Sequence, residues 1–144
     1  MKVKAMLESK GTKVETVAPD ATIETAVHLL KLQKIGAVVV SDDKKRVQGI
    51  LSERDIVRAL ASHGGATLQL RVADLMTREV KTTTPEVNVK DVMIEMTRGR
   101  FRHLPVLEEG QLAGIVSIGD VVKNRLDELE TETNVLRDYI VGRS

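Results

Sequence analysis

The chain has 144 residues, of which 42% are hydrophobic, enough for one compact domain or for two half-sized units that share a core. Lys and Arg number 22 and Asp and Glu number 21, a formal net charge of +1, so no overall positive field would attract a nucleic acid. There are only two aromatic residues, Phe101 and Tyr139, and no cysteine; this removes the usual stacking platforms for bases and excludes disulfides, thiolate metal sites and a cysteine nucleophile.

From the sequence pattern we expect neither a leader nor a membrane segment. Residues 1–15 carry charges every few positions and lack the apolar stretch of a signal peptide. Nowhere does the chain approach the ~18 uninterrupted apolar residues that a membrane helix needs. We therefore expect a soluble cytoplasmic protein without a membrane partner, and the absence of cysteine fits a reducing compartment.

The residue pattern of the first half of the chain predicts a lead-in segment, a strand, a helix, two strands and a second helix. Proline follows the first strand by two positions and favours extended geometry before it. Asp20 or Thr22 supplies a cap for the first helix, and Asp55 stands in the first turn of the second, where the helix dipole favours a carboxylate. In chain order these elements are residues 3–7, 14–17, 22–33, 37–40, 47–51 and 53–62.

The second half predicts the same elements in the same order after a linker at residues 62–70. Its helix at 87–99 has apolar side chains at helical spacing, and a turn-forming EEGQ joins its two later strands. In chain order the elements are residues 72–76, 80–83, 87–99, 103–107, 112–116 and 118–126.

The two halves are copies of each other. VETVAPDATI from Val14 aligns with VKTTTPEVNV from Val80 at an offset of 66 residues, and GILSERDIV (49–57) aligns with GIVSIGDVV (114–122) at 65. A unit of about 55 residues has a thin core and leaves one face of its sheet exposed, so the pair is the reasonable folding unit. We expect an α+β fold in which a pseudo-twofold pair of repeats packs through its sheets. The expected segments are repeat 1 with its lead-in helix at 1–66, repeat 2 at 67–126 and a C-terminal helix at 127–144.

Two tandem copies of strand, helix, small aliphatic strand and a G-h-x-S-x-x-D turn into a helix resemble a pair of cystathionine-β-synthase (CBS) domains, the Bateman module, as found in stand-alone bacterial proteins. The resemblance runs from Val3 to Leu126. One such motif is weak evidence, because Gly, Ser and Asp are common at strand-to-helix turns, but two in equivalent places are specific. The resemblance implies a regulatory module that binds AMP, ATP, NAD or S-adenosylmethionine in clefts between the repeats, and dimerisation into a flat disc.

The motif residues suit an adenosine ligand chemically. A carboxylate can accept both hydroxyl groups of a ribose, which suits Asp55 and Asp120. Ser52 and Ser117 stand three positions earlier, at helix N-termini whose backbone N–H groups can receive phosphate. Adenine needs a flat apolar slot with backbone edges, which the strand at 35–37 can line.

The main cleft uses the second motif. We expect it to bind a phosphorylated adenosine most tightly, because Arg102 and His103 stand where the first copy has Gly36 and Ala37 and so place cations beside it. AMP is the expected ligand, NAD(H) and ATP are alternatives, and no metal is expected. The predicted residues are Ala18, Ile23, Ile35, Gly36, Ala37, Arg102, His103, Ser117, Ile118, Gly119 and Asp120.

The second cleft uses the first motif and is expected to bind a weaker or different adenosine ligand, since Arg54 is its only motif cation. In the family, one repeat commonly holds the base while the Ser and Asp of the other hold the ribose-phosphate. By that scheme Arg102 and His103 also border this cleft. The predicted residues are Ser52, Arg54, Asp55, Thr84, Val89, Leu104 and Pro105.

Several of these residues have a plainer interpretation. Asp55 and Asp120 can be helix caps without a ligand, and His103 can be a hydrogen-bonded strand residue. His28 and His63 are interpreted as structural or exposed. Met93 and Met96 are expected in the core rather than at a cofactor, and the arginines of residues 98–102 usually form a solvated face.

The tail carries a helical seam, and the chain shows no catalytic motif. Leu126, Leu129, Thr133, Leu136 and Ile140 are spaced 3, 4, 3, 4, so the tail helix packs either on its own module or, as we prefer, across a dimer. There is no G-x-G-x-x-G, P-loop, H-E-x-x-H or G-x-S-x-G. We expect a nonenzymatic sensor that signals to an unknown effector protein.

Two other functions remain open at this point. The first is a ligand-independent dimerisation and assembly module. The second is RNA binding through Arg98, Arg100, Arg102 and the turn at 44–46, which the near-neutral charge and the scarcity of aromatic residues disfavour.

Overall fold

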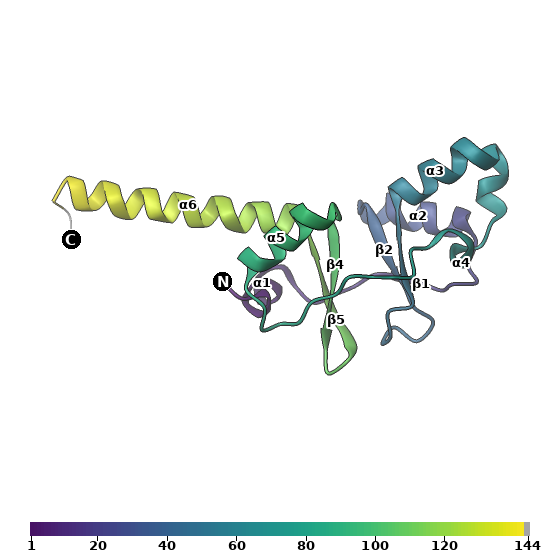
Figure 1. Cartoon of the computed structure of the whole chain (residues 1–144), viewed down its shortest axis with the longest axis horizontal. Helices are drawn as coiled ribbons and strands as arrows, with labels where there is room; N and C mark the ends of the chain where they lie inside the picture. Colours follow the sequence, from purple (N-terminus) through teal and green to yellow (C-terminus); the bar gives the residue numbers. More distant parts are fainter. Residues whose placement is uncertain (143–144) are drawn as a thin grey trace.

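The computed structural model describes residues 1–142 and has the expected α+β architecture, with two small sheets, their flanking helices and a long C-terminal helix that projects from the body (Figure 1). In chain order the elements are α1 (Val3–Lys10), β1 (Thr16–Val17), α2 (Ile23–Gln33), β2 (Ala37–Val40), β3 (Gly49–Ser52), α3 (Glu53–His63), the 3-10 helix η1 (Gly64–Gln69), α4 (Val72–Leu75), α5 (Val89–Gly99), β4 (His103–Glu108), β5 (Gln111–Ser117) and α6 (Ile118–Ile140).

The two sheets share one plan. β2 pairs antiparallel with β3, and β4 pairs antiparallel with β5. β1 adds a parallel strand to the first sheet, whereas the strand predicted at residues 80–83 shrinks to a single parallel bridge between Thr83 and Val106. The pairing sets Ser52 opposite Ala37 and Ser117 opposite His103, so each motif serine ends its strand beside the start of the neighbouring strand.

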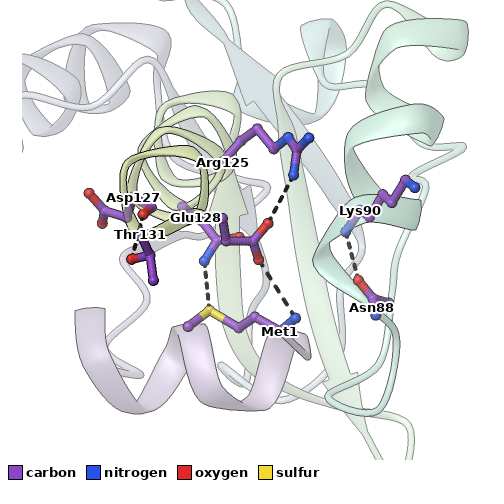
Figure 2. A network of polar contacts seen from close by, with 8 residues as sticks. Met1, Asn88, Lys90, Arg125, Asp127, Glu128 and Thr131 are labelled. Carbon is purple, nitrogen blue, oxygen red and sulfur yellow. Dashed lines mark hydrogen bonds and ion pairs between the residues drawn. The ribbon is translucent and has the colours of Figure 1, made fainter. Parts of the chain in front are cut away.

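Equivalent residues begin and end the helices that follow the first strands. Thr22 accepts a hydrogen bond from the Thr25 amide and caps α2, which confirms one of the two predicted caps; Asn88 caps α5 through the Lys90 amide (Figure 2). Lys34 ends α2 and Arg100 ends α5, and both have a φ of 56° in the left-handed region.

The lead-in helices are exchanged between the repeats. Val3, Met6 and Leu7 of α1 are buried in the core of the second repeat, and Val72 and Met76, from α4 and its C-cap, are buried in the core of the first. Figure 1 likewise draws α1 beside α5 and β5, and α4 beside β1. The division at residues 66 and 67 therefore follows chain order, whereas each core takes its lead-in helix from the other half of the chain.

The motif glycines are the points where these exchanged segments pack. A Cβ on Gly49 would lie 2.7 Å from Sδ of Met76 and 2.9 Å from the carbonyl oxygen of Thr77. A Cβ on Gly114 would lie 2.8 Å from a methyl carbon of Leu7. The glycine of G-h-x-S-x-x-D is thus needed for close packing of a lead-in segment against the strand that carries the site.

The last helix of the second repeat and the tail helix are one continuous helix. α6 runs through Asp127 without a break, and Val121 anchors its first turns in the core. The amino group of Met1 lies 3.8 Å from a carboxylate oxygen of Glu128 (Figure 2). Every described side chain after Glu128 is exposed, so the helix leaves the body there. Among residues 1–142, no helix has both the length and the apolar character needed to cross a membrane.

Candidate functional site

Each motif serine and aspartate form a reciprocal helix cap. The Ser52 amide donates to Oδ2 of Asp55 at 2.9 Å, and the Asp55 amide donates to Oγ of Ser52 at 3.3 Å. The Ser117 amide and Oδ2 of Asp120 are also 2.9 Å apart, and the Asp120 amide lies 3.2 Å from Oγ of Ser117. The capping role predicted as the plainer alternative is therefore real in both repeats.

The caps leave one oxygen of each carboxylate available. Every hydrogen bond to Asp55 and Asp120 side chains within residues 1–142 goes to Oδ2. Oδ1 can therefore accept a hydroxyl group of a sugar without opening the cap. The sequence predicts that the carboxylate accepts both hydroxyl groups of a ribose. If each oxygen accepts one of them, Oδ2 must accept from the ribose and from the cap at the same time.

A lysine that sequence reasoning missed lies on the second motif. Nζ of Lys10, at the end of α1, donates to Oδ2 of Asp120 at 2.5 Å and to the carbonyl oxygen of Ile115 at 2.9 Å. Among the described residues no lysine or arginine forms such an ion pair with Asp55. Because 110 residues separate Lys10 from Asp120, only the exchange of lead-in helices brings them together.

The two repeats meet where His103 lies against Gly36. A Cβ on Gly36 would lie 3.5 Å from Cε1 of His103 and 3.4 Å from Oε1 of Glu53. Both distances are ordinary contact distances, so a glycine here leaves a small gap between the repeats rather than relieving a clash. Gly36, His103, Asp120 and Lys10 therefore form one neighbourhood at the predicted main cleft, and Glu53 joins it from the first motif.

His103 and Asp120 differ in charge because their surroundings shift their pKa values for different reasons. Burial lowers the pKa of His103, the Glu53 carboxylate partly opposes this, and Lys10 and Arg102 lower the pKa further. The ring is therefore neutral at pH 7, and the expectation that His103 contributes a cation is corrected. For Asp120, partial burial would raise the pKa, but the hydrogen bonds from Lys10 and from the Ser117 amide together hold it below its ordinary value. Asp120 is thus an ionised acceptor.

The first-turn amides of both motif helices are partly used by the protein. The Ile118 amide donates to the carbonyl oxygen of Arg102 at 2.8 Å, and the Glu53 amide donates to that of Gly36 at 2.9 Å. Within residues 1–142 the amide of Gly119 has no hydrogen-bond partner. The sequence predicts that backbone amides near Ser117, at the start of α6, bind phosphate. Within residues 1–142 the Gly119 amide is the one among them that is still free to do so.

The structure divides the remaining predicted residues into three groups. A ligand can reach the buried ones only if the core opens, because Ile23 is 0% exposed, Leu104 0% and Val89 3%. The buried group is Ile23, Ala37, Val89, Leu104 and Pro105; the half-buried group is Ala18, Ile35 and Ile118; the exposed group is Arg54, Thr84, Arg102 and Gly119.

Two shallow hollows of the described surface lie away from both motifs. The larger, of about 490 Å³, is lined by Lys81, Asp91, Ile94, Glu95, Arg98, Gly99 and Phe101. The other, of about 380 Å³, lies along α6 and is lined by Thr131, Glu132, Val135, Leu136 and Tyr139.

Comparison with known proteins decides the family. The model of the CBS domain matches residues 9–62 and 72–127, which correspond to the two copies. The chain belongs to the CBS-domain family. It is 35% identical over 145 residues to the CBS domain-containing protein CBSX3, mitochondrial, of Arabidopsis thaliana, covering 95% of this chain and 70% of that protein.

Solved CBS-domain structures have the same fold. The CBS-domain containing protein ATU1752 from Agrobacterium tumefaciens is 50% identical, with a TM-score of 0.83 over 86% of this chain and 92% of that one. The CBS domain pair of MJ0100 is 25% identical, with a TM-score of 0.76 over 85% of this chain and 98% of that one, and was solved in complex with 5-methylthioadenosine and S-adenosyl-L-methionine. The predicted resemblance is confirmed, and so is the pairing of two CBS repeats in one fold.

Proposed function

We propose that this CBS pair is a regulatory sensor whose main cleft, at the cap formed by Ser117 and Asp120, binds a phosphorylated adenosine and signals the bound state to an effector protein. AMP is the first candidate, and NAD(H) and ATP are alternatives. The observation that carries the proposal is that both repeats contribute to one neighbourhood, in which Gly36 of the first lies against His103 of the second, beside Asp120 and Lys10. The MJ0100 pair, solved with two adenosine compounds, supports the ligand class.

The residues of the main cleft divide the ligand between them. Oδ1 of Asp120 accepts a ribose hydroxyl group, and the ionised state held by Lys10 keeps it an acceptor. The Gly119 amide at the start of α6 and the ammonium group of Lys10 are the donors for phosphate. A neutral His103 beside Gly36 offers the base a contact without charge.

The second cleft is proposed as the weaker one. The first motif has the same cap, but within residues 1–142 its oxygen Oδ2 accepts only from Ser52, and the nearest motif cation, Arg54, is exposed. An adenosine compound without phosphate therefore suits it better. The proposal also includes a cytoplasmic homodimer that acts through its effector and not as an enzyme.

The duplication provides a matched pair of variants for the test. Asp120→Asn and Asp55→Asn each replace the charged residue of one cap, and only the first also removes the charge that Lys10 contacts in the main cleft. We expect calorimetric titration with AMP, ATP and NADH to show one tighter event, which Asp120→Asn weakens about tenfold or more because a charge-assisted hydrogen bond is lost. Asp55→Asn is expected to leave that event in place.

Lys10→Met separates phosphate from sugar recognition. It is expected to weaken AMP binding while leaving adenosine binding nearly unchanged, because the hydrogen bond from the Ser117 amide still favours the ionised form of Asp120. Equal titrations for the wild type and Asp120→Asn would overturn the assignment of the site. The absence of heat with every adenosine compound, together with no thermal shift, would overturn the function and favour the ligand-independent assembly module.

A further inference from the structure

An apolar seam runs along the exposed side of α6. Counting in heptads, Leu126, Thr133 and Ile140 take the a positions, and Val122, Leu129 and Leu136 take the d positions. The exposed fractions are 47% for Val122, 61% for Leu126, 41% for Leu129, 60% for Leu136 and 72% for Ile140. Five large apolar side chains exposed along one side of a helix are unusual for the surface of a monomeric protein.

The body of the protein covers a different side of the same helix. Val121 is buried in the core, and Glu128, seven residues on, meets the amino group of Met1 (Figure 2). Both residues take the c position of the heptad. The d positions lie about 100° and the a positions about 160° round the helix from this side, so the seam stays open along its full length when the body is folded.

The charges beside the seam decide which partner fits it. In a parallel, in-register pair, a residue at g faces the residue five positions later, at e, in the other helix. Arg125 then faces Glu130 of the second copy, and Glu132 faces Arg137. In an antiparallel pair that aligns Leu129 with Thr133, e faces e and g faces g. Glu130 would then face Glu130, and Glu132 would face Glu132, while Lys123 would face Arg137.

We propose that residues 122–140 of α6 form a parallel, in-register coiled coil with the same helix of a second copy of this chain. Opposite charges flank the seam in this arrangement and like charges flank it in the reverse one. Thr133, the one polar residue of the seam, donates its hydroxyl group to the carbonyl oxygen of Leu129, so it can be buried without an unpaired donor. The two bodies then lie at the same end of the coil.

The pairing connects the dimer to the candidate site through one rigid element. α6 begins at the Ser117–Asp120 cap and has 23 residues, a length of about 35 Å. A parallel coil therefore holds the two caps near each other at its start. The pairing of α6 does not depend on which ligand the cleft binds.

The test uses the absence of cysteine in the natural chain. Leu129→Cys and Leu136→Cys place one thiol each at a d position, and Thr131→Cys, at the outward f position, is the control. Under mild oxidation we expect each d variant alone to form a disulfide-linked dimer at least about tenfold faster than the control, because parallel d residues face themselves. Rates no faster than that of Thr131→Cys would overturn the proposal. Faster linking in a mixture of Leu129→Cys and Thr133→Cys than in Leu129→Cys alone would replace it with the antiparallel pair.

A charge exchange tests the orientation without a disulfide. Glu132→Arg places two arginines against each other in each flank, and adding Arg137→Glu restores opposite charges. Sedimentation equilibrium is expected to show a weaker dimer for the single variant and recovery for the double variant. Equal dissociation constants for the two variants would contradict the parallel pairing, and circular dichroism confirms that both remain helical.

Discussion

The two CBS repeats have the same backbone plan and different chemistry at the same point. In the first repeat the carbonyl oxygen of Ile50 accepts from the backbone amide of Thr77 at 2.9 Å, whereas the equivalent oxygen of Ile115 accepts from Nζ of Lys10 at 2.9 Å. α4 ends at Leu75 and the chain then runs extended along β3, but α1 continues to Lys10. A longer lead-in helix thus replaces a neutral backbone donor with a cation beside Asp120.

In this chain the duplication has preserved the caps and the strand pairing but not the charge of the cleft. The caps depend on residues three positions apart, which a copy keeps together. The charge depends on a segment from the other half of the chain, whose length can change without disturbing either cap.

The largest expected effect is at the motif glycines. Gly49→Ala would force a Cβ against the Thr77 backbone, which cannot move without disturbing its bridge to Ile50. Gly114→Ala meets only the side-chain end of Leu7. We expect a loss in the free energy of unfolding of about 1–3 kcal/mol for Gly49→Ala and a smaller loss for Gly114→Ala. Urea unfolding measures both, and equal losses would show that the two lead-in segments are held equally tightly.

A smaller effect, and one that should be equal in the two repeats, is expected at the helix ends. Lys34 and Arg100 are exposed and both have a φ of 56°, a conformation that glycine adopts without strain. Lys34→Gly and Arg100→Gly are each expected to raise the free energy of unfolding by about 0.5–1 kcal/mol. Thermal and urea unfolding check this. A loss at one position only would reveal a side-chain contact that distinguishes the repeats.

The smallest effect is a pH dependence confined to the second repeat, because the first has Ala37 where the second has His103. The pKa of His103 in the folded protein lies below its ordinary value of 6.5, so the unfolded chain binds more protons between the two values and stability rises with pH in that window. His103→Gln is expected to flatten the part of this curve that lies just below pH 6.5, and the unfolding free energy measured from about pH 5 to about pH 8 checks it.

The exposed His28 provides the matched control for this experiment. His28→Gln is expected to leave the rise of the unfolding free energy with pH unchanged. An unchanged slope in His103→Gln would mean that another group causes it.

Local patterns predicted the elements well because local interactions form them. The caps at Thr22, Ser52 and Ser117 are contacts between residues three positions apart, and the apolar spacing of α2 and α5 correctly identified Met96 as a core residue. Ile23, Val89 and Leu104 were predicted as ligand contacts; the structure buries them in the cores, and their contact with a ligand stays a prediction. An apolar residue beside a motif looks the same in the sequence whether it faces a cleft or the interior.

Local sequence patterns establish the duplication, the order of elements in each copy and the motif serines and aspartates, since similar short segments fold alike. Tertiary contacts add that the lead-in helices cross to the opposite repeat, that Lys10 reaches Asp120, and that burial leaves His103 neutral. The tertiary structure also shows that the tail leaves the body as one continuous helix with its seam open. These features depend on contacts between residues as much as 110 positions apart and on the solvent exposure of each group, neither of which a local pattern encodes.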